Sequence, residues 1–292
     1  MAVYSIRDLE RLSGIKAHTL RVWESRYGII NPKRTDTNIR YYEDDDLRYV
    51  MNISLLNKNG FKISKIAAMT REQVAKKVSA ISEVSYEHDT QIDAMTISMV
   101  EMDELKFDRV MSLNIEQIGF EQTMLKIIHP FLEKLSLLWL TGSLKPAQEN
   151  FMSCLIRRKI ITAIDQEPLP RTYKKSFLLY LPEGERQELS LLFMHYLLRR
   201  RGFTVYYLGA DTGLLDLADA CDIHQPDFFY TMISETFARV PLKNYVNSVE
   251  KRFTETTLLL SGYQPVAQNI ENTDRVRVLR SLRETVEFME GL

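Results

Sequence analysis

Residues 4–69 read YSIRDLERLSGIKAHTLRVWESRYGIINPKRTDTNIRYYEDDDLRYVMNISLLNKNGFKISKIAAM, and this stretch decides the fold of the N-terminal part. Ser5 can cap a helix that runs to about Leu12, and Asp8, three residues after the cap, completes a pattern like the capping box. The segment 13–15, Ser-Gly-Ile, predicts the turn that follows, because glycine readily adopts the positive φ that such turns require.

A second helix is predicted from about Lys16 to Tyr27. Leu20, Trp23 and Tyr27 recur at helical spacing and form its inner stripe, so the two aromatic rings are expected to be core rather than base-stacking groups. Two helices joined by a short glycine turn indicate a helix-turn-helix, whose second helix enters the major groove of DNA. The candidate DNA contacts on this helix are Lys16, His18, Thr19, Arg21 and Arg26.

Arg21 is the strongest of these candidates, because a guanidinium can clamp a guanine or a phosphate with two hydrogen bonds. His18, Val22 and Ser25 are predicted to face outward with it. At that position His18 either contacts a base edge or a phosphate or is an ordinary surface histidine.

A loop opens at residues 31–34 and returns through residues 38–42, which predicts a small hairpin, or wing. Arginine is attracted electrostatically to a narrow minor groove, so the wing adds the candidates Lys33, Arg34, Arg40 and Tyr41. The acidic run 43–46 suits the positive end of a helix dipole and predicts a helix start rather than a metal site. That helix is expected to reach Asn59 and to be followed by a short helix over residues 61–69.

This order of elements resembles the winged DNA-binding domain of the MerR-type transcription regulators. The wording HTLRVWESRYG, residues 18–28, is closest to one subgroup, the CarH/LitR-like repressors, whose C-terminal half is a cobalamin-binding light sensor. The resemblance implies a double-stranded DNA operator and self-association as a dimer or tetramer. RNA polymerase is a further candidate partner.

The composition fits a protein of two or three domains. The 292 residues are 45% apolar and 26% charged, as in an ordinary soluble protein. No apolar run approaches the length of a membrane helix, and the first ten residues lack a signal core, so a cytoplasmic location is expected. Cys154 and Cys221 lie too far apart in sequence for a zinc motif, and their number argues against a disulfide framework.

The charge is distributed unevenly along the chain. Residues 1–72 hold 13 Lys and Arg against 9 Asp and Glu, whereas the whole chain holds 38 against 39. A basic N-terminal part on an acidic body fits nucleic-acid binding at one end, although many solvated faces are also basic.

The remaining chain divides into a helical and an alternating part. Residues 70–90 predict a helical or loosely ordered linker, and residues 91–166 predict a four-helix bundle, whose methionines are either core filler or the lining of a roomy pocket. Residues 176–292 alternate strands with helices, which predicts a doubly wound parallel, Rossmann-like sheet. The strands are expected at residues 176–181, 204–208, 228–233, 257–260 and 275–279. The expected domains are 1–75, a winged helix-turn-helix, 76–170, a helical bundle, and 171–292, a Rossmann-like sheet.

The resemblance also identifies a cofactor pocket that this chain matches only in part. The family's bundle carries W-x(9)-E-H over the corrin ring, and here Trp139 and Glu149 match while Asn150 replaces the histidine. An amide is a poor ligand for cobalt(III), which favours imidazole.

The family's sheet domain carries D/E-x-H-x-x-G in its first loop. Here Glu185 matches, Gln187 replaces the lower axial histidine and Ser190 replaces the glycine. Ser234 and Gly262 correspond more weakly to the family's later serine and glycine positions.

The sequence thus predicts a multidomain α and α/β protein that acts as a sequence-specific DNA-binding regulator, with repression favoured. Its C-terminal half is expected to have lost the cobalamin histidines and to serve oligomerisation or another signal, with no cofactor and no metal. The alternative is an adenosylcobalamin-dependent light-sensing repressor that binds the cofactor without those histidines. No enzyme is expected, because nucleotide, nucleophile-elbow and zinc-protease motifs are missing from the sequence.

Overall fold

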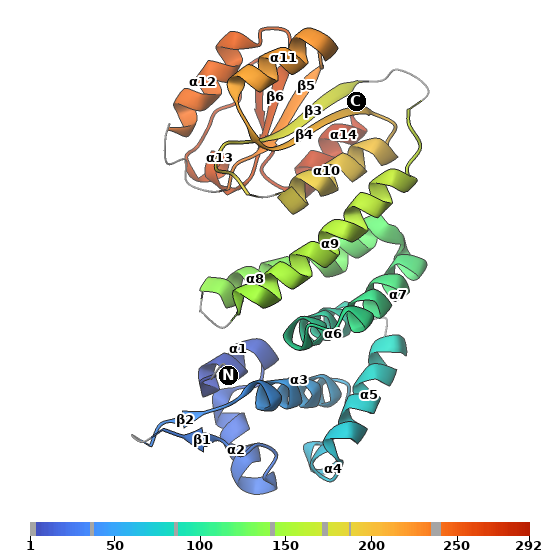
Figure 1. The fold of residues 1–292 in the computed structure, drawn as a ribbon, viewed down its shortest axis with the longest axis vertical. Coiled ribbons are helices and arrows are strands. Elements are labelled where there is room, and N and C mark those ends of the chain that lie inside the picture. Colours follow the sequence, from blue (N-terminus) through green and yellow to red (C-terminus); the bar gives the residue numbers. More distant parts are fainter. Residues whose placement is uncertain are drawn as a thin grey trace. The chain divides into compact units, whose positions relative to one another are not determined.

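The computed structural model of the protein describes residues 4–35, 38–84, 87–140, 144–170, 175–186, 188–234 and 241–292. The chain forms two compact units, Met1–Leu155 and Ile156–Leu292 (Figure 1). The expected three-part division, with boundaries after residues 75 and 170, stays a prediction.

The first unit begins with the elements that the opening stretch predicts. They are α1 (Ile6–Ser13), α2 (Ala17–Tyr27), the two-stranded wing of β1 (Lys33–Arg34) and β2 (Arg40–Tyr41), α3 (Asp44–Lys58) and α4 (Ile63–Ala67). Ser5 caps α1 in a complete capping box with Asp8, as predicted. Glu43 and Asp46 form a second capping box at the start of α3. The local signals therefore placed most of these boundaries within about two residues.

The segment predicted as a linker is an ordered helix, α5 (Arg71–Val84). Val74 and Val78 are buried, and α5 packs against α3 and against α7 (Glu104–Thr123). Arg71 lies 3.6 Å from Asp46, and its guanidinium lies over the ring of Tyr49. Helix α5 is therefore fixed to α3 and α7 rather than loosely ordered.

The helical part continues through α6 (His88–Glu101), α7, a π-helical turn η1 (Met124–Ile128), α8 (His129–Leu140) and α9 (Pro146–Gln166). Pro146 begins α9 as predicted, since a helix tolerates proline in its first turn. Met95, Met99 and Met111 are buried, so these methionines fill the core. Gly119 breaks the helical geometry inside α7 with φ +78° and ψ 163°.

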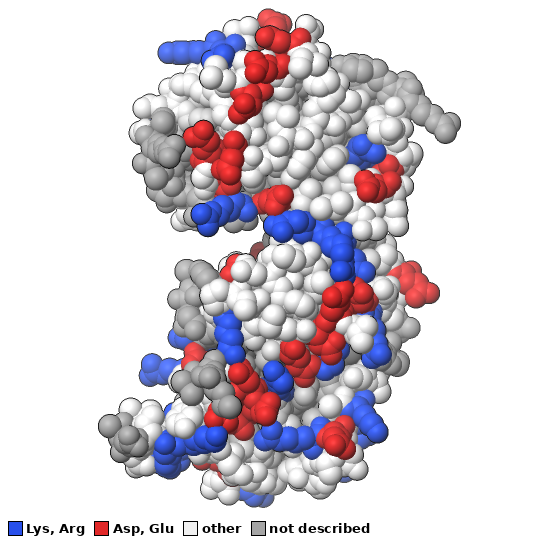
Figure 2. Space-filling view, in the orientation of Figure 1, with Lys and Arg blue, Asp and Glu red and all other residues white. Residues whose placement is uncertain are grey.

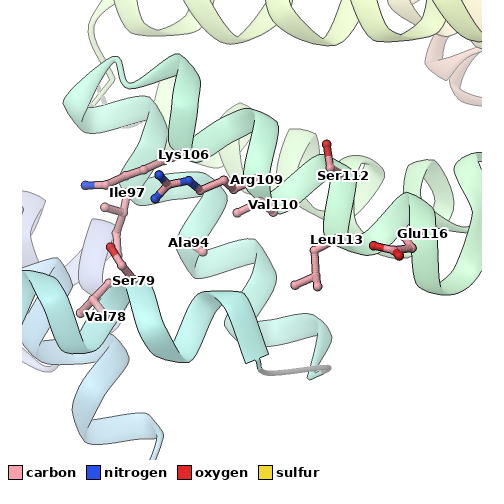
Figure 3. Close-up of a pocket in the computed structure, with 10 residues that line it drawn as sticks. All are labelled: Val78, Ser79, Ala94, Ile97, Lys106, Arg109, Val110, Ser112, Leu113 and Glu116. Atoms are coloured by element: carbon pink, nitrogen blue, oxygen red, sulfur yellow. The ribbon is translucent and has the colours of Figure 1, made fainter.

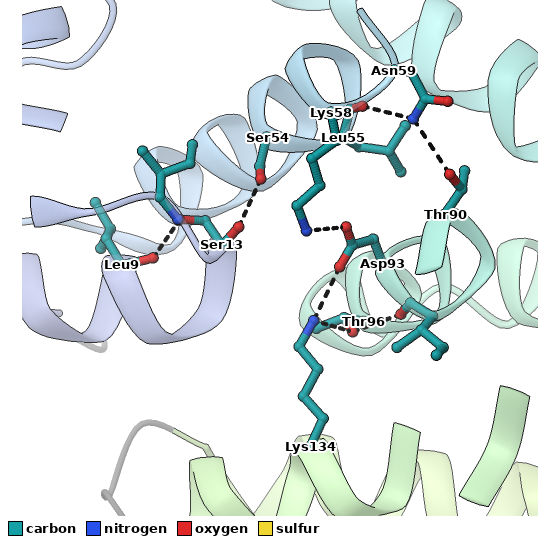
Figure 4. Close-up of polar contacts among 12 residues, drawn as sticks. Leu9, Ser13, Ser54, Leu55, Lys58, Asn59, Thr90, Asp93, Thr96 and Lys134 are labelled. Carbon is teal, nitrogen blue, oxygen red and sulfur yellow. Dashed lines mark hydrogen bonds and ion pairs between the residues drawn. The ribbon is translucent and has the colours of Figure 1, made fainter. Parts of the chain in front are cut away.

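A polar network joins the end of α3 to the helices α6 and α8 (Figure 4). Asp93 of α6 lies 2.5 Å from the ammonium of Lys58 at the end of α3 and 3.2 Å from that of Lys134 in α8. Asn59 also donates to the hydroxyl of Thr90. We call Lys58, Asp93 and Lys134 the ionic clasp.

The second unit is the predicted doubly wound parallel sheet. Its strands are β3 (Ser176–Pro182), β4 (Thr204–Thr212), β5 (Phe228–Met232), β6 (Thr257–Ser261) and β7 (Val276–Val278), in the order β4-β3-β5-β6-β7. Its helices are α10 (Glu188–Arg200), α11 (Leu214–His224), α12 (Leu242–Arg252), α13 (Tyr263–Ala267) and α14 (Leu282–Glu290). The sequence did not predict α13, and α10 begins three residues later than expected because a turn follows β3.

Successive residues of a strand face opposite sides of the sheet. Phe228 stacks on Phe177, and the α14 residue Phe288 packs edge-on against Phe228. On the other face, Tyr180 and Phe229 pack with residues of α12, which lies beside α11 in Figure 1. Helices therefore cover both faces of the sheet.

Within the described residues, helices long enough to cross a bilayer all lack a sufficiently apolar stretch.

Candidate nucleic-acid interface and sheet-edge site

The turn between α1 and α2 is held by side chains buried beneath it. Gly14 ends α1 with φ +74°. Ser13 donates its hydroxyl to the carbonyl of Leu9 and accepts from the amide of Ile15, while Ser54 of α3 donates to the Ser13 carbonyl at 2.7 Å. These bonds fix the angle at which α2 leaves the domain.

The N-terminus of α2 is held by a carboxylate that the sequence reading missed. The amide of Ala17 donates to Glu10 at 3.0 Å, and Lys16 lies 3.2 Å from the same carboxylate. The backbone hydrogen bond from Ala17 is the main reason that the pKa of Glu10 is lowered. Lys16, a candidate DNA contact, is therefore paired with the Glu10 carboxylate.

The outer face of α2 is exposed as predicted. Leu20 is buried, Trp23 and Tyr27 are half-buried, and His18 and Arg21 are exposed. Val22, Ser25 and Arg26 share this exposure, whereas Thr19 is half-buried. The helix therefore presents a polar face with two arginines to an approaching duplex.

An ion pair joins the wing to α2. Arg40 of β2 lies 3.4 Å from Glu24 of α2, and Arg34 donates to the side chain of Asn38 at 2.7 Å. The other carboxylate oxygen of Glu24 is buried, and it has no hydrogen-bond partner in the described part of the chain. Glu24 was not predicted, because nothing in its spacing indicates contact with a residue 16 positions away.

Lys33 is paired as well, and Tyr41 is half-buried. Glu43 accepts a 2.6 Å hydrogen bond from Lys33, and this bond is the main cause of the raised pKa of the lysine. In Figure 2, blue Lys and Arg side chains lie over the wing and α2 with red carboxylates beside them. The structure therefore brings α2 and the wing together, with several of their cations held by carboxylates.

The second candidate site lies at the C-terminal ends of the strands, where β3 and β5 meet. The first and third strands of the sheet are neighbours there, and ligands bind such sheets at this point. Glu185, only 3% exposed, accepts from the backbone amides of Ser234 at 2.7 Å and Arg186 at 3.0 Å. Its carboxylate therefore joins the loop after β3 to the loop after β5.

Gly262 closes the same edge. Its φ is +102°, and a Cβ placed there would lie 2.4 Å from the carbonyl oxygen of Ile233. Gln264, which the sequence reading missed, donates its backbone amide to that carbonyl at 3.0 Å. The loop after β6 can therefore approach the loop after β5 this closely only with glycine at position 262.

The other predicted pocket residues are only partly described. Ser190 is half-buried in the first turn of α10, Glu149 is half-buried and Asn150 is exposed in α9. Gln187 lies outside the described residues, as does the side chain of Trp139. Glu149 and Asn150 belong to the first compact unit and Glu185 to the second.

Both histidines of the second unit stack on tyrosines of the edge strand β4. His195 stacks on Tyr207 and His224 on Tyr206, with ring centroids 5.3 and 3.9 Å apart. Burial lowers the pKa of His195 to about 4. No group of three or more His, Cys, Asp or Glu side chains suited to a metal occurs among the described residues.

Comparison with known proteins finds a family model that matches the N-terminal part. Residues 4–73 match the model of the family described as MerR HTH family regulatory protein. The HTH-type transcriptional repressor CarH of Myxococcus xanthus is 26% identical over 232 residues, 77% of this chain and 77% of that protein. The repressor CarA of the same organism is 28% identical over 239 residues, 81% of this chain and 77% of that protein.

Among solved structures, a cobalamin-binding protein from Desulfitobacterium hafniense resembles the chain with a TM-score of 0.37 and 13% identity. The match covers 71% of this chain and 98% of the chain of that protein.

Proposed function

We propose that this chain, whose residues 4–73 form a MerR-type helix-turn-helix domain, is a sequence-specific DNA-binding transcriptional repressor. The observation that carries the proposal is the exposed outer face of α2 beside a wing that an ion pair ties to it. Repression is favoured because CarH and CarA, which resemble the chain over more than three quarters of its length, are repressors.

In this proposal α2 reads the major groove and the wing follows the backbone or the minor groove. Arg21 makes the base contact, because its exposed guanidinium matches the acceptors of guanine. Arg40 is oriented by Glu24 at 3.4 Å, so it reaches the DNA in one preferred direction. The other exposed cations of α2 and the wing contact phosphate and set the register.

The test is operator binding by the full-length chain and its point variants. Arg21→Ala should cost about 1–3 kcal/mol in affinity if Arg21 makes a bidentate base contact, and less if it touches only phosphate. Lys76→Ala is the matched control, because Lys76 is an exposed cation on α5 outside the proposed interface. Equal loss in both variants, or no loss in either, would remove α2 from the interface.

A deletion of residues 1–72 is a poor test of the same point. Helix α3 packs on both α5 and α6, so the deletion would expose apolar surface of the remaining unit. Salt dependence is the better second measurement, because phosphate contacts release counterions and affinity should fall steeply as salt rises.

We further propose that the C-terminal sheet has kept a cobalamin-type fold without holding the cofactor through histidine. Asn150 and Gln187 stand at the two positions where the resembling family has its axial histidines. The Glu185 carboxylate accepts hydrogen bonds from two backbone amides. The amide side chains at these two sequence positions do not fit the preference of cobalt(III) for imidazole.

Titration with adenosylcobalamin in the dark, followed by gel filtration, tests this second proposal. We expect no stoichiometric retention and no absorbance change on illumination. Tight retention with an oligomer change in light would establish the rival function, a light-sensing repressor that binds cobalamin without histidines. The variant Gln187→His with Ser190→Gly and Asn150→His should partly restore binding if the pocket has persisted.

We also propose that the chain associates with itself. Self-association as a dimer or tetramer would give an operator of repeats or palindromes with matching spacing. RNA polymerase is a further partner consistent with this class of regulator, and the cytoplasm is the compartment in which such a repressor acts.

A further inference from the structure

A cavity of about 350 Å³ lies between α5, α6 and α7, within the first compact unit (Figure 3). Its floor is made by Val78, Ala94, Ile97 and Val110, all of them buried. The volume falls within the range of small-molecule sites, which are mostly apolar with a few polar groups. It is separate from the sheet edge, which lies in the other unit.

One stripe of α7 supplies most of the polar lining. Lys106, Arg109, Leu113 and Glu116 recur every three or four residues, so they share a face about 15 Å long. In Figure 3 the Lys106 and Arg109 side chains lie together near Ile97, and Glu116 lies at the far end beyond Leu113. The two cations that line the cavity therefore lie at one end, Leu113 lies in the middle and the Glu116 carboxylate lies at the other end.

The wall formed by α5 is held by contacts outside the cavity. Arg71 binds Asp46 and stacks on Tyr49 of α3, and Lys77 lies over the ring of Phe61. Because these contacts do not depend on an occupant, the cavity is preformed, and a ligand need not order it.

We propose that this cavity binds an organic monoanion with an unbranched apolar body, its charged head at Lys106 and Arg109. The Lys106 ammonium contacts Glu101 and lies 3.8 Å from Asp103, and an ammonium has three donor protons to share. The Arg109 guanidinium, on an exposed residue, supplies planar donors that match a carboxylate. Glu116 disfavours a second negative charge at the other end, so dianions are rejected.

The test is calorimetric titration of the full-length chain with decanoate, decanol and decanedioate. Decanoate should bind at one site per chain, decanol more weakly and decanedioate most weakly. Arg109→Gln should weaken decanoate by about tenfold, the loss expected for one charge-assisted hydrogen bond, and leave decanol unchanged. Lys76→Gln, an exposed cation on α5 away from the cavity, should change neither.

A second variant tests the apolar body independently of charge. Leu113→Trp places an indole in the middle of the cavity and should abolish binding of decanoate and decanol alike, with an unchanged circular dichroism spectrum. Absence of decanoate binding, equal affinity for the three probes, or indifference to both variants would overturn the proposal. A lower solution mass of the Leu113→Trp variant would also overturn the proposal, because the cavity would then be a contact between copies of the chain.

Discussion

Position 262 requires glycine because the backbone after β6 passes close to the backbone of Ile233 after β5. Its φ of +102° with ψ near 179° belongs to a region that only glycine occupies readily. Ile233 leaves no space for a Cβ on this residue. Gly184 provides a comparison, because its φ is +88° while nothing lies within 4 Å of an added Cβ.

Gly262→Ala should therefore destabilise the second unit by about 3 kcal/mol or more, from strain and collision together. Gly184→Ala should cost about 1–2 kcal/mol, from strain alone. Urea unfolding followed by circular dichroism is the appropriate measurement, because both tryptophans, Trp23 and Trp139, lie in the first unit. Equal costs in the two variants would show that the loops separate at little cost.

His195 is the residue from which a pH dependence follows. Burial, and then the charge of Arg199, lower its pKa to about 4, while Asp165 acts in the opposite direction. Its Nε2 is buried and has no hydrogen-bond partner among the described residues. The folded state therefore prefers the neutral imidazole that stacks on Tyr207.

The unfolded chain takes up a proton near pH 6.5, whereas the folded chain does so only near pH 4. This contribution to stability is thus full above pH 6.5 and is lost as the pH falls toward 4, with a size of about 2–3 kcal/mol. His195→Phe keeps an aromatic ring at this position and removes the imidazole that takes up the proton. Its unfolding free energy should fall less than that of the natural chain between pH 6.5 and 4.5, and parallel curves would contradict the assignment.

At the scale of the elements, the ionic clasp joins the end of α3 to α6 and α6 to α8. Asp93 is largely buried between two lysines, and Lys58 is the more exposed of them. Burial lowers the pKa of Lys134, and Asp93 opposes that shift. Lys134 also donates to the hydroxyl of Thr96 at 3.2 Å.

Asp93→Asn should cost about 2–4 kcal/mol, because it leaves the Lys134 ammonium without its counterion, whereas Lys58→Gln should cost about 1 kcal/mol or less. The double variant Asp93→Asn with Lys134→Met should recover part of the loss, since removing both charges removes the unpaired one. Tryptophan fluorescence during urea unfolding measures these costs in the first unit. Strict additivity in the cycle would mean that the two side chains do not interact.

At the scale of the whole molecule, the last described helix, α14, belongs to the α/β part. Helix α14 packs onto the sheet, with the ring of Phe288 5.6 Å from that of Phe228. We propose that self-association uses surfaces of the helical or the α/β part.

Light scattering of the full-length chain at micromolar concentration should accordingly give at least twice the chain mass of 34.1 kDa. The mass should persist in salt high enough to abolish DNA binding, because the two surfaces differ. A monomer under both conditions would refute self-association and leave the DNA-binding proposal to be judged by the Arg21 variant.

The sequence by itself determined most of the elements and their order. The capping box of Ser5 with Asp8, the glycine turn at Gly14 and the helical spacing of Leu20 all act within a few residues. Such signals remain readable because the physics behind them is local. The alternation of strands with helices likewise predicted the parallel sheet.

Only the tertiary structure decided which residues distant in sequence contact one another. Glu185 meets Ser234 across 49 positions, Lys134 meets Asp93 across 41, and Arg40 meets Glu24 across 16. The same holds for α5, which reads as a polar linker until Val74 and Val78 are buried. A charge or a short apolar stripe has many possible partners in a sequence, and packing selects one of them through burial and distance.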